Sequence, residues 1–227
     1  MPATKSYELA RQHMVESQLI PNDIHSDAVL DAMRAIPRED FVPDAMKGSA
    51  YIDEELPVGR GRYLLEPVLF AHMLELANIQ KTDKVLDVGC ATGYSTLVLC
   101  HLAKQVVAVE EQMELAEQAR QQLNHLQCDA AEVITSPLVP GHPAGGPYDV
   151  ILINGAVEVI PDALVDQLAE GGRMVFVKLC HSPAKSVAGL GRLCLGRKIG
   201  GQLAVREVRD ASSPLLAGFE KKRSFVF

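Results

Sequence analysis

The chain is 227 residues long, carries a formal net charge of −7 and has 48% apolar side chains. This length suits one α/β domain with room for a small added lobe, and the apolar fraction suffices for a full core. The acidic balance argues against a surface that tracks phosphates, so DNA or RNA is not expected as a partner. No apolar run reaches the length of about 18 residues that a membrane helix needs, and the amino terminus lacks the apolar core of a signal peptide. We therefore expect no membrane partner, and we expect a cytoplasmic location.

The cysteines are odd in number, and no two have the C-x-x-C spacing of a zinc or redox site, so they are predicted to be reduced thiols. Cys90 alone falls in a turn that we predict below to bind a ligand, where it would be half exposed. Packing is favoured over a nucleophilic role for Cys90, because no histidine or cation adjoins it. No two of the seven histidines have metal-ligand spacing, so no metal site is predicted.

Two short helices are predicted ahead of any strand. Apolar residues recur at helical spacing from Ser6 to Gln18, and a second helix is expected from Asp27 to Ile36, with Ser26 or Asp27 as its N-cap. A segment rich in proline and glycine follows as loop or short hairpin, and a helix from Pro67 to Leu76 comes after it, with proline in its first turn. Long ordered loops are usually functional. Residues 1–78 are therefore predicted to cap the rest of the chain.

The stretch from Lys84 to Glu111 predicts one βαβ unit. An apolar strand from Val85 to Val88 stops at a turn that spans Gly89 to Gly93. A helix from Tyr94 to Leu102 and a second apolar strand, which ends on Glu110, complete the unit. Such a turn lies at the carboxyl ends of parallel strands, where open α/β sheets bind their ligands.

The residues around the turn indicate which ligand is bound. Gly89 fits the first glycine of a dinucleotide fingerprint, but Ala91 and Tyr94 occupy the second and third positions. Asp87 would repel a diphosphate, yet it would attract the ammonium and sulfonium groups of S-adenosylmethionine. Glu110 follows the turn by about 20 residues, where a carboxylate holds a ribose hydroxyl pair. The pattern therefore favours S-adenosylmethionine over a nicotinamide cofactor, with a fold that has lost its ligand as a third interpretation. The predicted cofactor residues are Asp87, Gly89, Cys90, Ala91, Thr92, Gly93, Glu110 and Glu111.

A second strand of interest runs from Tyr148 to Ile153 and is apolar enough for the centre of a sheet. It is expected to end at Asn154, on the same edge as the predicted ligand. Asn154 is therefore a candidate contact to the substrate, with a simple turn residue as the alternative. The other expected elements are a helix (113–126), a strand (131–135), a loop (137–147), a helix (161–169), a strand (173–178), a glycine-rich crossing loop (181–201) and a terminal antiparallel hairpin (202–208 with 219–227).

Three blocks of sequence carry a family resemblance. They are Pro37-Arg38-Glu39-x-Phe41-Val42-Pro43, then Leu56-Pro57-x-Gly59-x-Gly61, then Val85-Leu86-Asp87-x-Gly89 with Gly93-Tyr94. In this combination the chain resembles the protein-L-isoaspartate O-methyltransferase family, from about residue 10 to about residue 177.

The resemblance implies one Rossmann-like, class I S-adenosylmethionine-dependent methyltransferase domain over residues 1–227. Its sheet would have seven strands, mostly parallel, with a terminal antiparallel hairpin. The implied activity is protein repair, in which the carboxylate of L-isoaspartyl residues in damaged proteins is methylated, so the implied partner is a protein or peptide that carries isoaspartate. The implied substrate loop consists of Val58, Gly59, Gly61, Tyr63 and Leu64.

The chain departs from the family pattern at several site positions. The family sequence Gln-Thr-Ile-Ser-Gln-Pro aligns with Arg62 to Pro67, so Leu65 stands where the family has its serine at the methyl-transfer site. Ser136 takes the place of an acid on the adenine side, Ala91 that of a glycine and Glu111 that of an arginine. A serine hydroxyl lost beside a charged substrate leaves that charge less well solvated. Two alternatives therefore accompany the repair function, namely a cofactor-binding regulatory protein without the chemistry and a methyltransferase for another acceptor.

Overall fold

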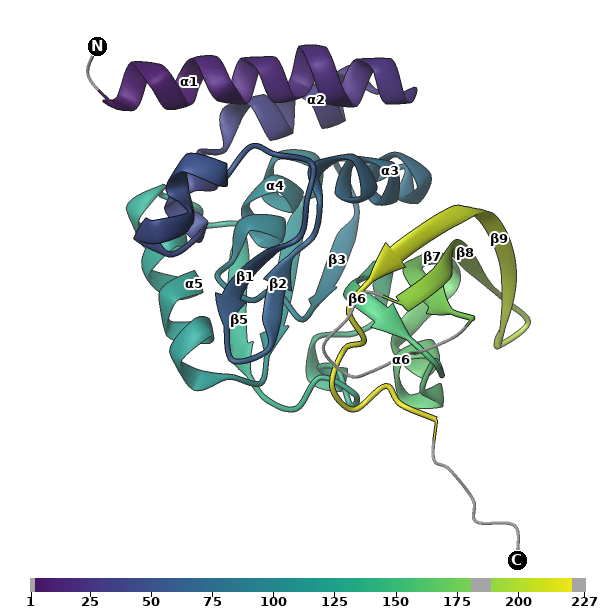
Figure 1. Cartoon of the computed structure of the whole chain (residues 1–227). Helices are drawn as coiled ribbons and strands as arrows, with labels where there is room; N and C mark the ends of the chain where they lie inside the picture. Colours follow the sequence, from purple (N-terminus) through teal and green to yellow (C-terminus); the bar gives the residue numbers. More distant parts are fainter. Residues whose placement is uncertain (1–2, 181–188, 222–227) are drawn as a thin grey trace, which may run out of the picture.

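The computed structural model describes residues 3–180 and 189–221, which form a seven-stranded sheet, a separate two-stranded hairpin and helices around them (Figure 1). The main sheet has the strand order β5-β4-β3-β6-β7-β8-β9. The strands are β1 (Leu56–Gly59), β2 (Arg62–Leu64), β3 (Lys84–Val88), β4 (Gln105–Glu110), β5 (Ala131–Thr135), β6 (Tyr148–Val157), β7 (Leu168–Leu179), β8 (Gly189–Ile199) and β9 (Gln202–Ser213). The helices are α1 (Ala3–Met14), α2 (Asp27–Ala35), α3 (Pro67–Ala77), α4 (Tyr94–Leu102), α5 (Met113–His125) and α6 (Asp162–Gln167).

The parallel half of the sheet consists of β5, β4, β3, β6 and β7, and β8 and β9 continue it in antiparallel pairing. Strand β3 is apolar almost throughout because helices and loops cover both of its faces. Val85 lies in the larger apolar cluster, whereas Leu86 and Val88 lie in the other. The predicted sheet of seven strands, mostly parallel and ending in an antiparallel hairpin, is confirmed.

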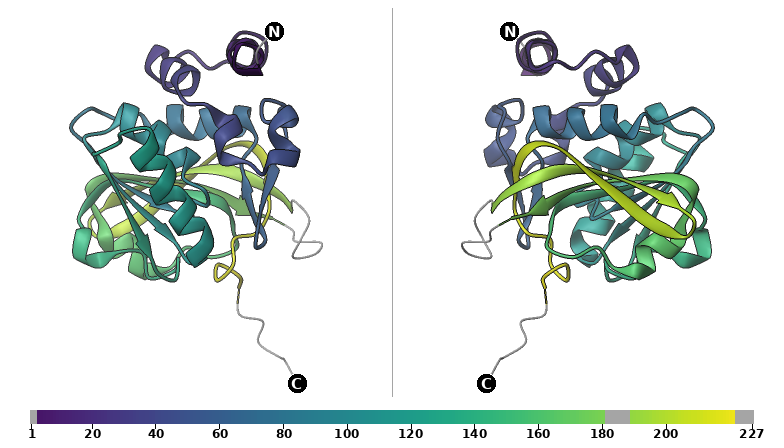
Figure 2. Two further views of the ribbon diagram at one scale, coloured as in Figure 1. Left: turned by 90° about the vertical axis from the view of Figure 1, so that its left-hand side faces the viewer. Right: turned by 90° about the vertical axis from the view of Figure 1, so that its right-hand side faces the viewer.

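Two apolar layers sandwich the sheet. One contains buried side chains of α3, α4 and α5, with those of α2 outside them. The other contains Leu138 and Leu164 from the opposite side, together with Leu216 and Phe219 from the segment that follows β9. Figure 2 shows α1 and α2 stacked beyond the main helical layer. The two layers fix the sheet so that its strand ends can carry a site.

The segment ahead of β3 has the predicted elements. The helix expected from Ser6 is α1, which passes into a π-helical turn over Val15–Leu19. Ser26 caps α2 as predicted, since its Oγ accepts a hydrogen bond of 3.4 Å from the amide of Val29. The stretch with several prolines forms the β1–β2 hairpin, and α3 begins at Pro67.

Strand β6 is longer than the sequence predicts. The apolar run was expected to end at Asn154, but β6 continues to Val157. The reason is a partner far along the chain: the amide of Ala156 donates to the carbonyl of Pro214 (2.9 Å), and the amide of Leu216 donates to the carbonyl of Ala156 (2.8 Å). Helix α6 is also shorter than the predicted helix at 161–169. It ends at Gln167 because the next residue, Leu168, pairs with Tyr148 as the first residue of β7.

The crossing loop predicted for residues 181–201 is wrong where the structure describes it, because residues 189–199 form β8. Glycine served there as a loop signal, but Gly191 packs so tightly that a Cβ atom would lie 2.5 Å from the carbonyl oxygen of Lys178 on β7. The hairpin turn is Gly200-Gly201, with both φ angles positive (58° and 79°). The predicted hairpin of 202–208 with 219–227 is also wrong, because the partner of β9 is β8. Phe219 is buried and lies outside any strand. Residues 181–188 and 222–227 lie outside the described residues.

Over residues 3–180 and 189–221, no helix combines the length and apolar character needed to cross a membrane.

Candidate functional site

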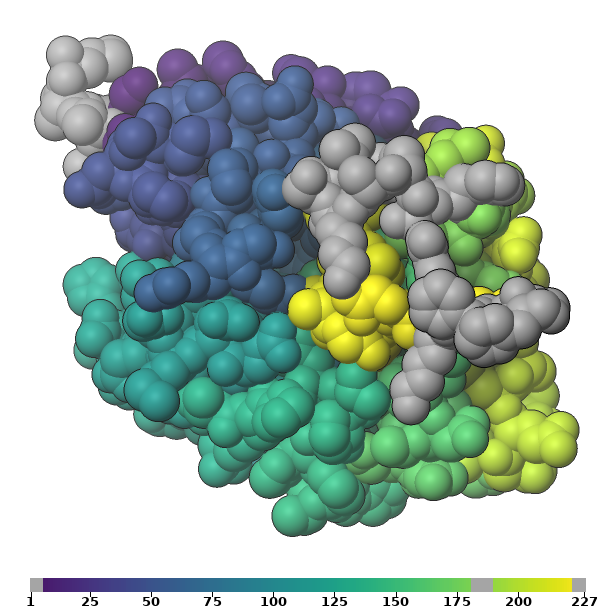
Figure 3. All heavy atoms as spheres, turned by 60° about the horizontal axis from the view of Figure 1, so that its bottom comes forward, coloured from purple at the N-terminus to yellow at the C-terminus, as the bar shows by residue number. Residues whose placement is uncertain are grey.

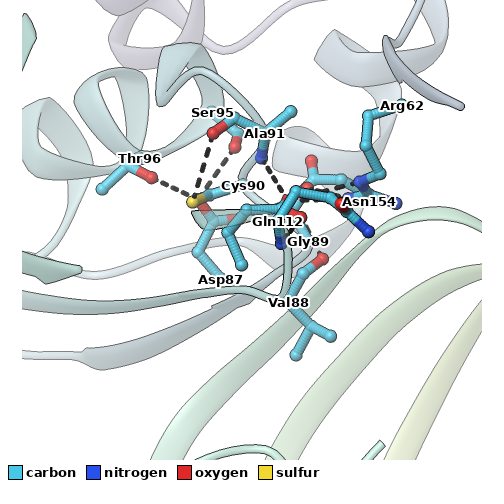
Figure 4. A network of polar contacts seen from close by, with 11 residues as sticks. Arg62, Asp87, Val88, Gly89, Cys90, Ala91, Ser95, Thr96, Gln112 and Asn154 are labelled. Carbon is cyan, nitrogen blue, oxygen red and sulfur yellow. Dashed lines mark hydrogen bonds and ion pairs between the residues drawn. The ribbon is translucent and has the colours of Figure 1, made fainter. Parts of the chain in front are cut away.

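The carboxyl ends of β3, β4 and β6 meet at one edge of the sheet, and most of the predicted site residues gather there (Figure 4). The Gly89–Gly93 turn leads from β3 into α4. In Figure 4, Arg62 and Asn154 approach this turn from one side, and Ser95 and Thr96 lie on the other.

Asp87 is the buried anchor of this edge, with no exposed surface. Its Oδ2 accepts hydrogen bonds from the hydroxyls of Ser95 (2.8 Å) and Thr96 (2.7 Å), and its Oδ1 accepts one from Asn154 Nδ2 (2.5 Å). Burial raises the pKa of Asp87, and the three hydrogen bonds oppose that shift. Asp87 therefore orients Asn154 and the first turn of α4. Ser95 and Thr96 were missed by sequence reasoning, although their place directly after a glycine turn was a usable signal.

The turn itself requires unusual backbone conformations. Gly93 has a φ of 96°, and a Cβ atom there would lie 3.0 Å from the Cβ of Ala119 on α5. Ala91 is a non-glycine residue with a φ of 50°, at the position where the family pattern has glycine. Thr92 ties the turn to the segment ahead of β1, since its hydroxyl donates to the carbonyl of Phe41 (2.7 Å).

Glu110 lies at the end of β4 and has no exposed surface. Its Oε2 accepts from the amide of Ala91 (2.9 Å), and its Oε1 accepts from the amide of Gln112 (3.1 Å). Glu111 is half buried beside it, and the amide of Ser136 donates to the Glu110 carbonyl (3.1 Å). A fixed carboxylate of this kind suits a pair of hydroxyl donors such as those of a ribose.

Arg62, on β2, reaches the same carboxylate and was missed as a site residue. Only 5% of its side chain is exposed, and its Nη2 lies 3.2 Å from Glu110 Oε2. The same nitrogen donates to the carbonyl of Gly89 (2.7 Å). The signal in the sequence was its alignment with a family glutamine.

Leu65 follows β2, and its side chain is 5% exposed. Its carbonyl accepts a hydrogen bond from Arg38 Nη2 (2.7 Å), whose Nε donates to the carbonyl of Ala50 (2.8 Å). The Arg38 guanidinium stacks over the ring of Tyr94 at 4.8 Å, and burial lowers its pKa. Among the described residues, Arg38 Nη1 and Tyr94 Oη have no hydrogen-bond partner. A buried cation thus lies directly behind Leu65.

A small hollow joins these groups. It brings both candidate catalytic residues, Leu65 and Asn154, together with the turn. Of the predicted substrate loop, Tyr63 and Leu64 line it, Val58 faces a different hollow beside Phe41, and Gly59 and Gly61 are exposed at the hairpin tip. The lining residues are Arg38, Tyr63, Leu64, Leu65, Phe70, Gly89, Cys90, Ala91, Tyr94, Ser95 and Asn154.

Cys90 differs from the expectation of a half-exposed side chain, because only 1% of it is exposed. Burial raises the pKa of its thiol well above the ordinary value, which keeps the group protonated. The expected packing role is thus the one that fits the geometry. Within residues 3–180 and 189–221, no cluster of three or more histidine, cysteine or acidic side chains could hold a metal ion.

Comparison with known proteins decides the family. The model of the family protein-L-isoaspartate(D-aspartate) O-methyltransferase matches residues 10–180. The chain belongs to the protein-L-isoaspartate O-methyltransferase family. A family member from Koribacter versatilis is 44% identical over 174 residues, which cover 77% of this chain and 78% of that protein. One from Methylorubrum extorquens is 43% identical over 169 residues, which cover 73% of this chain and 72% of that protein.

Solved structures agree on the fold. A protein-L-isoaspartate O-methyltransferase structure superposes with a TM-score of 0.77 at 24% identity; the match covers 92% of this chain and 66% of that longer one. A Plasmodium falciparum structure, titled as such a methyltransferase in complex with S-adenosyl-L-homocysteine, has a TM-score of 0.75 at 18% identity and covers 91% of this chain and 97% of that one. Membership of the protein-L-isoaspartate O-methyltransferase family confirms the predicted enzyme class and S-adenosylmethionine as its cofactor.

The residues present fit that cofactor. Glu110 offers a buried carboxylate at the right strand end, and Gly89 leaves a space without a Cβ atom beside it. In the structure the Arg62 guanidinium lies in that space, 2.3 Å from where a Cβ atom on Gly89 would be.

Proposed function

We propose that this chain transfers a methyl group from S-adenosylmethionine to the side-chain carboxylate of L-isoaspartyl residues in damaged proteins. One observation carries the proposal: in a member of this family, the candidate catalytic residues Leu65 and Asn154 line the same hollow as the Gly89–Ala91 turn. A donor and an acceptor held there would be adjacent, and alignment is the main requirement of this reaction.

The cofactor-binding roles follow from the geometry. Glu110 would hold the ribose hydroxyls, with its carboxylate fixed by two backbone amides. Gly89 and Gly93 would give the backbone its close approach, and Asp87 would fix the amino-acid end through Ser95, Thr96 and Asn154. When bound, S-adenosylmethionine supplies an electrophilic methyl group on a sulfonium that leaves as a neutral thioether.

The acceptor side needs no general base. A carboxylate is a nucleophile at neutral pH, so its oxygen forms the new bond to the methyl carbon as the carbon–sulfur bond breaks, and no proton moves. The protein must exclude water and place the two groups in line. Leu65 excludes water from the hollow, and the Arg38 guanidinium behind it would attract an anionic acceptor in this dry region.

A second function is favoured by the same residue. Leu65 offers no hydroxyl to a charged acceptor, which suits either a cofactor-binding protein without methyl transfer or a methyltransferase for a more apolar acceptor. The isoaspartyl activity and these alternatives require the same cofactor site. They differ in what they require of the side chain at Leu65.

Titration calorimetry with S-adenosylhomocysteine, followed by tritium transfer to an isoaspartyl peptide and to its aspartyl counterpart, tests the proposal. We expect binding and transfer to the isoaspartyl peptide alone. Glu110→Gln should weaken binding at least tenfold, whereas Glu117→Gln, an exposed acid on α5, should not. Binding without transfer to either peptide would reject repair in favour of a binding role.

We further propose that residues 1–78 cap this single domain, that the partner is a protein rather than nucleic acid or membrane, and that the protein works in the cytoplasm. The net charge of −7 supports the choice of partner. The five cysteines are free, as suits a reducing compartment.

A further inference from the structure

The β1–β2 hairpin carries Arg62 to Glu110, the carboxylate proposed to hold the ribose. Arg62 Nε and Nη2 lie 3.3 Å and 3.2 Å from Glu110 Oε2. The carboxylate has no exposed surface, and the arginine side chain is 5% exposed. Glu110 is therefore already neutralised by a residue of the chain itself.

This pair is the strong contact between the hairpin and the strand ends. At the hairpin tip, Arg60 also pairs with an acid, Glu114 on α5, at 2.7 Å, but both side chains are 60% exposed. Exposed pairs contribute little, whereas breaking a buried pair leaves an uncompensated charge. The Arg62–Glu110 pair thus favours the closed position of the hairpin far more than the Arg60–Glu114 pair does.

The guanidinium also fills space that a nucleoside would use. It donates to the Gly89 carbonyl (2.7 Å) and lies against the bare Cα of that glycine. The adjoining hollow has room for only about one water molecule, so a nucleoside does not fit there as the structure stands. A ribose that donates to Glu110 Oε2 would have to displace Arg62.

We propose that Arg62 is an internal competitor of the cofactor's nucleoside, so that binding requires the β1–β2 hairpin to release Glu110 and move outward. This inference rests on the proposed function, because it assumes that Glu110 receives the ribose. A protein that binds only in a minor open state has an apparent dissociation constant raised by the inverse of the open fraction. Cofactor affinity is then set by the hairpin as well as by the site.

Arg62→Gln, which restores the residue of the family pattern, tests this directly. Calorimetry with S-adenosylhomocysteine should show at least tenfold tighter binding for Arg62→Gln than for the natural chain. The matched control is Arg60→Gln, the same change two residues away on the same hairpin, which should bind within about twofold of the natural chain because its ion pair is exposed. Equal or weaker binding by Arg62→Gln would overturn the proposal, and weaker binding would make Arg62 a cofactor ligand instead.

A second measurement keeps folding apart from binding. In the absence of ligand, Arg62→Gln should unfold at a lower temperature than the natural chain, because Glu110 has lost its cation. S-adenosylhomocysteine should raise the melting temperature of Arg62→Gln by more than it raises that of the natural chain. A ligand-induced shift no larger than that of the natural chain would contradict the competition.

The outcomes separate this inference from the proposed function. Tighter binding by Arg62→Gln without methyl transfer to the isoaspartyl peptide would reject the acceptor and retain the competitor. Transfer by all three proteins with unchanged affinity would reject the competitor and retain the function. Binding by none of the three would reject both.

Discussion

Asn154 Nδ2 lies 2.5 Å from Asp87 Oδ1, and this contact joins the carboxyl end of β6 to that of β3. The same nitrogen lies 3.3 Å from the carbonyl of Val88, so both amide hydrogens of Asn154 are used within the protein. What Asn154 can offer to the hollow is its carbonyl oxygen, an acceptor. It is therefore suited to an ammonium or an N–H group, and not to the carboxylate that is methylated.

Asn154→Ala should leave Asp87 without one of its three donors. We expect the free energy of unfolding to fall by about 1–3 kcal/mol, the cost of an unsatisfied buried acceptor. Affinity for S-adenosylhomocysteine should fall several-fold, because the Asp87 side chain beside the turn is then held by two donors instead of three. Urea titration and calorimetry measure the two effects. Asn124→Ala, on the exposed side of α5, is the control, and a stability loss equal to the control's would show that the contact contributes little.

Leu65→Ser restores the family hydroxyl at the hollow. A hydrogen bond to a charged group contributes about 1.5–3 kcal/mol, so kcat/KM for an isoaspartyl peptide should rise about tenfold to a hundredfold. Stability should fall by about 2–5 kcal/mol, as for other truncations of buried leucine. Leu64→Ser, the neighbouring residue with the same 5% exposure, should lose stability without gaining activity. If the two variants gave the same rate, Leu65 would not be the position that limits the reaction.

Ala91→Gly should stabilise the protein slightly. The φ of 50° at Ala91 costs a residue with a Cβ atom about 1–2 kcal/mol of strain, which glycine would not suffer. Against this, glycine loses more conformational entropy on folding than alanine does, at a cost of roughly 0.5–1 kcal/mol. A net gain of about 0.5–1 kcal/mol in urea unfolding is expected. Ala28→Gly, in the regular helix α2, should instead cost up to about 1 kcal/mol. A loss of stability in both variants would mean that the surrounding contacts of Ala91 relieve its strain.

Glu55 should make stability depend on pH. Burial raises its pKa from 4.5 to about 7, and its Oε1 has no partner among the described residues. An acid whose pKa is higher in the folded state favours folding at low pH, so this stability is lost as the pH rises from about 4.5 through about 7.

Glu55→Gln removes the charge that folding buries. The variant should therefore exceed the natural chain in urea unfolding at pH 8 and match it at pH 4.5. The adjacent Glu54 is exposed, so Glu54→Gln should show no such difference between the two pH values. A Glu55→Gln stability curve parallel to that of the natural chain would argue against a buried, charged Glu55.

The parallel strands and their turn were predictable because their signals are local. Strands covered on both faces are continuous apolar runs, and the Gly89–Gly93 turn directly follows one of them. Strand β8 was not predictable in the same way. Its glycines serve close approach to other strands, as Gly191 does beside Lys178 and Gly196 beside Leu203, whose Cδ1 would lie 2.8 Å from an added Cβ. Composition alone gives such glycines the signature of a loop.

The site shows the same limit. Asp87 and Glu110 were identifiable from their places at strand ends, and Leu65 from the family pattern. The partner of Glu110 was not, because Arg62 lies 48 residues away in sequence and reaches it only through the path of the hairpin. The spacing of apolar residues along the chain does not predict a contact between residues so far apart in sequence.

The residues that extend β6 beyond Asn154 come from outside the region matched to the family. Residues 10–180 carry the match, whereas Pro214 and Leu216 bond to Ala156, and a Cβ on Gly155 would lie 3.2 Å from Leu216. Figure 3 shows this terminal segment in yellow beside the blue region that includes the hairpin. The proposed cofactor residues, Asp87 to Gly93 and Glu110, therefore lie within the sequence matched to the family. The residues that hold the backbone next to Asn154 lie outside it. A substitution at Pro214 or Leu216 would therefore alter the backbone beside Asn154 without touching the Gly89–Gly93 turn or Glu110.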